Sequence, residues 1–166
     1  MRNRYWYFFY EITYKKYYYE SFYKFYKRIN WIISAGLNIT SLSCIAAWSI
    51  WDKHQLIWAV LICFSQVVQA LFPKLPYNDL LIAEQFMFPS LEKLYRSIEK
   101  DWLVIDQKNL SEKKIMKKLL HHQQKYADLV DFYMPSQFLP DIFFCEKEAE
   151  KNTQRFFRNN YNTEGM

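Results

Sequence analysis

The fold is decided by two uncharged stretches near the middle of the chain, Trp31-Ile-Ile-Ser-Ala-Gly-Leu-Asn-Ile-Thr-Ser-Leu-Ser-Cys-Ile-Ala-Ala-Trp-Ser-Ile-Trp51 and Leu56-Ile-Trp-Ala-Val-Leu-Ile-Cys-Phe-Ser-Gln-Val-Val-Gln-Ala-Leu-Phe72. The first has no charged residue over 21 positions and the second has none over 17, and only Asp52-Lys-His-Gln55 separates them. About 20 apolar helical residues cross a bilayer core of roughly 30 Å, and about 17 is the lower limit. A four-residue link allows only a tight turn, so residues 31–73 are predicted to form a transmembrane hairpin of two antiparallel helices.

The alternative is a buried helical hairpin inside a soluble bundle, because the first stretch contains polar residues and the second is short for a span. A soluble helix, however, normally carries charges on a solvent face, and neither stretch has any. Amphipathic rings also settle at the bilayer interface. Four tryptophans at or near the ends of the stretches are therefore candidate interfacial anchors: Trp31, Trp48, Trp51 and Trp58.

The composition predicts an all-helical protein, and the distribution of charge predicts on which side of the membrane the termini lie. The 166 residues include only two glycines and five prolines, which leaves little material for the turns of β-hairpins. Residues 1–30 carry seven Lys or Arg side chains against two Glu side chains. Because an excess of Lys and Arg marks the cytoplasmic side, we expect a multi-pass membrane protein with both termini in the cytoplasm. No cleavable signal peptide precedes Trp31, so the first span is expected to act as a signal anchor.

The N-terminal segment is unusually aromatic: 14 of the first 26 residues are Tyr, Phe or Trp. Such a segment can stack on nucleic-acid bases, with lysines on the phosphates. It can also lie in the headgroup layer as an interfacial helix, or pack against a cytoplasmic bundle. Direct contact with nucleic acid is the least favoured of the three, because the segment leads straight into a span. Residues 1–30 are therefore predicted to form an aromatic and basic cytoplasmic helix that leads into the membrane.

Residues 74–158 are predicted to form cytoplasmic amphipathic helices. The first has Asn78 or Asp79 as its N-cap and continues past a kink at Pro89, the second begins after Ser111, and the third is capped by Asp141 and ends near residue 158. The N-terminal aromatic helix is their natural packing partner, and residues 159–166 are expected to be a flexible tail. Apolar side chains at helical spacing form the predicted packing stripe: Leu91, Leu94, Ile98, Trp102, Ile115, Leu119, Tyr126 and Leu129.

Polar residues inside the two stretches are the sharper functional signal. When the hairpin is folded about residues 53–54, Asn38 comes level with Gln69 and Ser41 with Gln66. Side-chain amides in hydrocarbon need partners, and bonds between helices of this kind contribute roughly 0.5–2 kcal/mol each. These groups either close the hairpin or join protomers, or they line a wet pore. The candidate residues for these roles are Ser34, Asn38, Ser41, Ser65, Gln66 and Gln69.

No catalytic set, cofactor motif or metal site stands out, and we expect a protein that is not an enzyme. His121 and His122 are adjacent, so on a helix they point about 100° apart, and no Cys or carboxylate follows at ligand spacing. We therefore read His122 as part of the packed stripe and His121 as solvated. Glu99 and Asp101 are read as helix surface charges. The chain also has no glycine-rich phosphate loop.

Three segments carry a family resemblance: Phe25-Tyr-Lys-Arg-Ile-Asn-Trp31, the hairpin itself, and Lys125-Tyr-Ala-Asp-Leu-Val-Asp131 before Phe138-Leu-Pro-Asp-Ile142. Their order resembles the SLATT family, small two-span proteins associated with bacterial nucleotide-signalling and retron-like antiviral systems. The likeness is architectural and covers roughly residues 20–158. It implies an effector that assembles in the inner membrane and disrupts it when an upstream sensor protein signals infection, and it supplies no catalytic residues.

The preferred hypothesis is an inner-membrane effector that forms homo-oligomers and permeabilises the bilayer, as a toxin of an abortive-infection system against phage. Two alternatives remain open. The hairpin can be only an anchor for an adaptor whose cytoplasmic helices bind a protein partner, or the chain can be a holin-like lysis protein.

Overall fold

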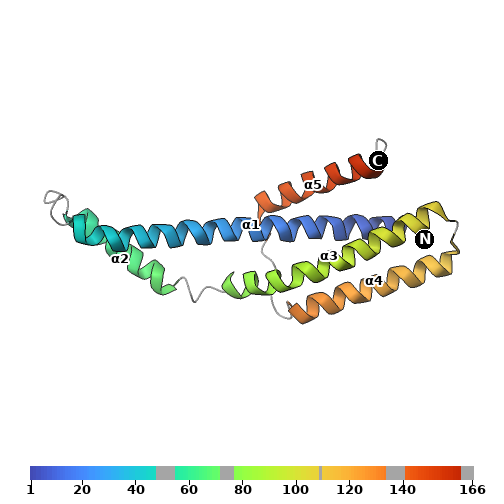
Figure 1. Ribbon diagram of the computed structural model, residues 1–166, viewed down its shortest axis with the longest axis horizontal. Coiled ribbons are helices and arrows are strands. Elements are labelled where there is room, and N and C mark those ends of the chain that lie inside the picture. Colours follow the sequence, from blue (N-terminus) through green and yellow to red (C-terminus); the bar gives the residue numbers. More distant parts are fainter. Residues whose placement is uncertain (48–54, 72–76, 109, 134–140, 162–166) are drawn as a thin grey trace. The chain divides into compact units, whose positions relative to one another are not determined.

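The computed structural model describes residues 1–47, 55–71, 77–108, 110–133 and 141–161, and every regular element in these ranges is an α-helix. Within the helices, side chains are described except at residues 37–47, 55, 57–58, 61, 69 and 77–84. The all-α class expected from the composition is therefore confirmed. The helices are α1 (Arg2–Ala47), α2 (Gln55–Leu71), α3 (Tyr77–Gln107), α4 (Glu112–Tyr133) and α5 (Phe143–Tyr161) (Figure 1).

The chain divides into two compact units. Unit 1 contains Met1–Lys24 and Leu80–Met166, so it joins the start of α1 to α3, α4 and α5, and unit 2 contains Phe25–Asp79. The expected partnership between the N-terminal aromatic helix and the later amphipathic helices is confirmed, because one hydrophobic core contains residues of both. Segments that are distant in sequence thus form one body, with the hairpin region inserted between them along the chain.

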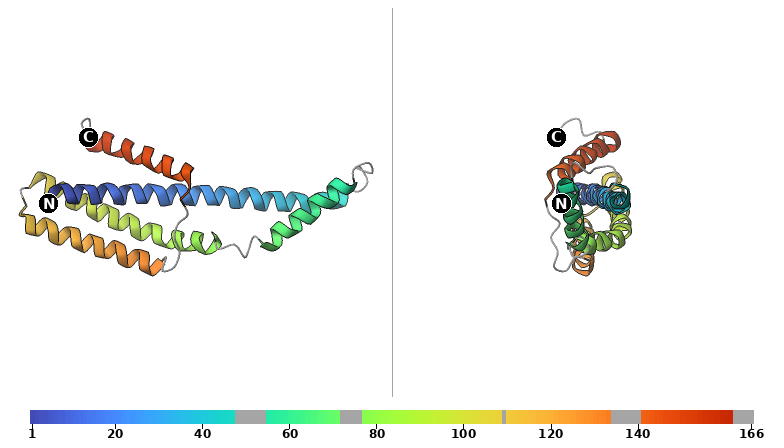
Figure 2. Two further views of the ribbon diagram at one scale, coloured as in Figure 1. Left: turned by 180° about the vertical axis from the view of Figure 1, so that it is seen from behind. Right: turned by 90° about the vertical axis from the view of Figure 1, so that its left-hand side faces the viewer.

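Contacts set the helix directions inside unit 1. Arg2, at the start of α1, pairs with Asp106 near the end of α3. Phe9 comes later in α1 and packs on Tyr95, which comes earlier in α3. The two helices are therefore antiparallel. Figures 1 and 2 show α3 and α4 on one side of α1 and α5 on the other.

The core of unit 1 is aromatic because α1 presents large rings at spacings of three and four residues, which fall on one face of a helix. Rings from α1, α3 and α5 meet there: the Trp6 ring lies 4.7 Å from that of Trp102, and the Phe9 ring lies 5.2 Å from that of Phe157. Three roles were considered for the aromatic segment, and these buried rings agree with packing against the helical bundle. The buried residues that α1 contributes to this core are Tyr5, Phe8, Phe9, Ile12 and Tyr19.

Helix starts agree with the sequence at one place and differ at two. The Ser111 carbonyl accepts bonds from the amides of Lys114 and Ile115, so Ser111 does begin α4. The helix α3 already includes Asn78 and Asp79, which excludes both as its N-cap. α3 also continues as one helix through Pro89, although proline removes one backbone donor there.

The start and end of α5 both lie later than predicted. The Ile142 carbonyl accepts the first helical bond, from the amide of Glu146 at 3.0 Å, so Ile142 and not Asp141 holds the N-cap position. At the other end α5 continues to Tyr161. Residues 159–161, which were predicted to belong to a flexible tail, are therefore helical. Tyr161 is held because its ring packs 5.5 Å from Trp6 and its hydroxyl donates to Glu99 at 3.3 Å.

Unit 2 contains the last part of α1 and the whole of α2. In both views α2 runs back along the C-terminal part of α1, as in a helical hairpin (Figures 1 and 2). Among the residues that the structure describes, no helix combines the length and the apolarity needed to cross a bilayer.

Candidate functional site

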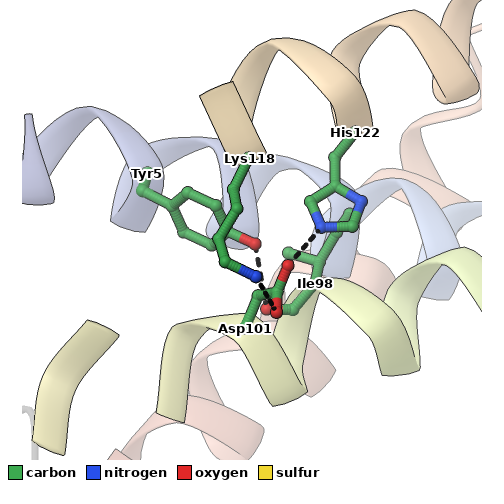
Figure 3. Close-up of polar contacts among 5 residues, drawn as sticks. All are labelled: Tyr5, Ile98, Asp101, Lys118 and His122. Atoms are coloured by element: carbon green, nitrogen blue, oxygen red, sulfur yellow. Dashed lines mark hydrogen bonds and ion pairs between the residues drawn. The ribbon is translucent and has the colours of Figure 1, made fainter. Parts of the chain in front are cut away.

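A polar cluster lies inside unit 1, where α3 and α4 meet the start of α1 (Figure 3). Lys118 Nζ donates to Asp101 Oδ1 at 2.7 Å, and His122 Nε2 lies 2.9 Å from Asp101 Oδ2. The Tyr5 hydroxyl donates to the carbonyl oxygen of Ile98 at 3.2 Å, in the turn before Asp101. We call Asp101, Lys118 and His122 the Asp–Lys–His cluster.

The interpretation of Asp101 as a surface charge is wrong, because its side chain is only 20% exposed and accepts bonds at both oxygens. His122 is buried and His121 is exposed, which confirms the reading of that pair. A sequence signal for the cluster does exist. Asp101 directly precedes the stripe residue Trp102, and Lys118 precedes Leu119, so both charges stand at the edge of a buried face.

Burial controls the protonation states in the cluster. Burial lowers the pKa of His122 below its usual value, and the carboxylate of Asp101 offsets this only in part. Burial raises the pKa of Asp101, but the hydrogen bonds and charges of Lys118 and His122 outweigh that effect and hold this pKa below its usual value. At neutral pH the cluster is therefore an ionised Asp101, a charged Lys118 and a neutral His122 whose Nε2 proton faces the carboxylate.

The free nitrogen of His122 is not placed for catalysis. His122 Nδ1 is buried and has no hydrogen-bond partner within the described residues, and the Tyr5 ring lies edge-on 6.3 Å from the imidazole. A general base needs to reach the proton that it removes. Among the residues that the structure describes there is also no group of three His, Cys, Asp or Glu side chains close enough to hold a metal ion. The Asp–Lys–His cluster thus joins α3 to α4 and orients Lys118.

Acidification is expected to destabilise unit 1 through His122. The folded state keeps His122 neutral at pH values where the unfolded chain already protonates it, so unfolding takes up a proton. The free energy of unfolding is unaffected by His122 above about pH 6.5, where this side chain is neutral in both states. As the pH falls from there toward the lower pKa of His122 in the folded protein, the free energy of unfolding decreases by up to about 1.4 kcal/mol per pH unit. The contribution of Asp101 is lost only at lower pH, since the bonds from Lys118 and His122 hold its pKa in the folded protein below its usual value.

Urea unfolding of the full chain in detergent, at about pH 7.5 and about pH 5.5, measures this slope. His122→Gln should flatten it, whereas His121→Gln removes an exposed ring whose charge is a minor cause of the lowered His122 pKa, so it should reduce the slope much less. An equal slope in wild type and His122→Gln would assign the response to another titrating group.

The polar candidates of the hairpin are described in part. Ser34 and Gln66 are exposed, and the half-buried Ser65 hydroxyl donates to the Ile62 carbonyl at 2.8 Å within its own helix. The side chains of Asn38, Ser41 and Gln69 lie outside the described part, so neither predicted pair is seen in full. Of the four interfacial tryptophans Trp31 is exposed, Trp48 and Trp51 are outside the described residues, and so is the side chain of Trp58.

The eight stripe residues all belong to the core of unit 1. Six of them are buried, and Tyr126 and Leu129 are partly buried against the others. They are therefore the faces of α3 and α4 that pack in the core shared with α1 and α5, and a change at any of them acts first on folding.

An exposed apolar face runs the length of α2. Five large side chains recur there at spacings of three and four residues, so they share one side of the helix. Each is 55–77% exposed: Leu56, Val60, Phe64, Val67 and Leu71. Exposed apolar surface of this extent on a single element is typical of a protein or membrane contact.

Comparison of the chain with known protein families, with characterised proteins and with solved structures found no significant match.

Proposed function

We propose that this protein is a membrane effector whose hairpin inserts into the bacterial inner membrane, forms homo-oligomers and makes the bilayer leaky. The observation that carries the proposal is the apolar face of α2 (Leu56, Val60, Phe64, Val67 and Leu71). Covering one such side chain stabilises by about 1.5–3 kcal/mol, so five in a row strongly favour lipid or another apolar helix over water.

The dimensions of α2 are compatible with a thin or locally thinned bilayer. Its 17 residues rise about 25 Å, a few ångströms less than the hydrocarbon core of roughly 30 Å. A short apolar helix is accommodated by thinning of the bilayer or by oligomerisation, at a modest cost per ångström. The absence of charge in residues 31–51 and 56–72 supports insertion, and the basic N-terminus supports cytoplasmic termini.

Amides inside the hairpin supply the proposed route for leakage. Gln66 is exposed on α2, between Ser65 and the apolar Val67. An amide that faces lipid without a partner is costly, so assembly that brings amides of several copies together is favoured. Such a lining carries no charge and suits a non-selective leak. The setting of abortive infection is proposed on the resemblance to SLATT proteins, and no enzymatic step is involved.

Gln66→Leu/Gln69→Leu is expected to keep the protein in the membrane and to abolish leakage. The test is release of carboxyfluorescein from vesicles of phosphatidylethanolamine and phosphatidylglycerol that contain the full chain. Gln66→Asn/Gln69→Asn keeps both amides and serves as the matched control, with leakage expected within about threefold of wild type. Wild-type leakage by the leucine variant would remove the amides from the mechanism.

A membrane-anchored adaptor is the second candidate, and a specific feature of unit 1 supports it. Phe132, Phe143 and Phe144 are all at least two-thirds exposed, the first near the end of α4 and the other two at the start of α5. If the chain is an adaptor, Phe143→Ser/Phe144→Ser abolishes its biological activity while the leucine variant of the hairpin is harmless. A buried residue such as Leu119 is unsuited to this test because its substitution acts on folding.

A further inference from the structure

A pocket of about 540 Å³ opens beside the Asp–Lys–His cluster, between α3 and α4. Five of its lining residues come from successive turns of α4, at positions 114, 117/118 and 121/122, a spacing that places them along one side of the helix. The hydroxyl of Ser97 and the carboxylate of Asp101 come from α3, and Leu110 adds an apolar wall from the turn between the helices. The lining residues of α4 are Lys114, Lys117, Lys118, His121 and His122.

The pocket has a surplus of positive charge. The one carboxylate among its described lining residues, Asp101, is already bonded to Lys118 and His122, so it neutralises one of the three lysines. Lys114 and Lys117 are exposed, and neither side chain has an ion-pair partner among the described residues. Two lysine charges are thus left to face the pocket.

The bond to Asp101 also makes Lys118 a fixed group. Its side chain is 37% exposed and is held at 2.7 Å from a partly buried carboxylate, which itself is held by His122 from the next turn of α4. A solvated lysine surface has no such support, because each of its side chains moves freely. The pocket therefore combines one oriented cation with two adaptable ones.

We propose that this pocket binds the phosphate group of a phosphomonoester, with Lys114 and Lys117 as its charged ligands. A phosphomonoester carries a charge of about −1.5 to −2 near pH 7, which matches two uncompensated lysines. Lysine binds phosphate as a point charge, with short charge-assisted hydrogen bonds. Ser97 adds a neutral donor from the opposite helix.

The volume of the pocket indicates more than a bare phosphate ion. Pockets for small organic ligands typically measure about 300–1,000 Å³ and combine apolar walls with a few polar groups. The pocket lies within this range, and Leu110 and the imidazole of His121 provide surface for the organic part of the ligand. The same phosphate chemistry occurs in a soluble metabolite and in a lipid headgroup. The site is independent of how the hairpin acts.

The test is isothermal titration calorimetry on the full chain in a non-ionic detergent, with two probes. The soluble probe is glycerol 3-phosphate, and the lipid probe is dioctanoyl phosphatidic acid in mixed micelles. We expect saturable binding of one ligand per chain that weakens as salt is raised, since counter-ions screen exposed lysines. Binding of the soluble probe identifies a free phosphomonoester as the ligand class, and binding of the lipid probe alone identifies a headgroup.

Lys114→Gln/Lys117→Gln is expected to weaken binding at least about tenfold, because each variant position loses a charge-assisted bond. Both side chains are exposed, so the urea midpoint should stay that of wild type. Lys147→Gln/Lys151→Gln removes the same charge from exposed positions of α5, which does not line the pocket, and should bind as wild type. Equal weakening in both double variants, or no saturable binding of either probe, would overturn the proposal.

Discussion

Phe9→Ala is expected to lower the free energy of unfolding of unit 1 by about 3–5 kcal/mol, the cost of removing a fully buried ring. The Phe9 ring contacts rings from two other helices: it lies 6.0 Å from Tyr95 of α3 and 5.2 Å from Phe157 of α5. Each aromatic pair adds about 0.5–1.5 kcal/mol beyond the area that it buries. The alanine variant also leaves a cavity at the junction of three helices, where none of them can move in without breaking other contacts.

Urea unfolding of the full chain in detergent measures this loss, followed by the far-ultraviolet circular dichroism of the helices. Tyr7→Ala is the matched control, because it removes an aromatic ring that is 69% exposed in the same turn of α1. The control should remain within about 0.5 kcal/mol of wild type. Similar losses in the two variants would mean that the aromatic face of α1 is not the one that the core uses.

Val60→Lys/Phe64→Lys is expected to move the protein out of the membrane fraction. Both side chains belong to the exposed apolar face of α2 and lie near the middle of the helix, one turn apart. A lysine at the centre of a span costs about 2.5–3.5 kcal/mol on insertion scales, and the favourable terms of Val and Phe are lost as well. Two substitutions therefore shift the insertion equilibrium by more than about a thousandfold.

Extraction of membranes with alkaline carbonate distinguishes inserted from released protein. Phe132→Lys places one new charge at a residue of unit 1 that is 77% exposed, and this variant should stay in the membrane fraction like wild type. Wild type that is itself extracted by carbonate would contradict insertion of the hairpin. Retention of the double lysine variant would show that α2 is not the segment that holds the protein in the bilayer.

The helices and their buried faces were predictable because the signal is local. In α3 and α4 the apolar residues recur at spacings of three and four, and the side chains at those positions are the ones that pack in the core, as Ile98 and Leu119 illustrate. Helix ends were less predictable, since they depend on contacts from outside the helix. Tyr161 extends α5 beyond its polar composition because Trp6 and Glu99 hold it.

Some features of the candidate sites were likewise predictable from the sequence, and others depended on tertiary contacts. The uncharged hairpin region, the all-α class and the stripes were determined by the sequence itself, because composition and period act over a few turns. The Asp–Lys–His cluster was decided only by the tertiary structure. Asp101 and His122 are 21 residues apart and lie on different helices. No local sequence pattern predicts that α3 and α4 pack so that this carboxylate meets the imidazole, with Lys114 and Lys117 beside them. The same reason explains the aromatic segment, whose composition allowed three roles until its rings were found against α3 and α5.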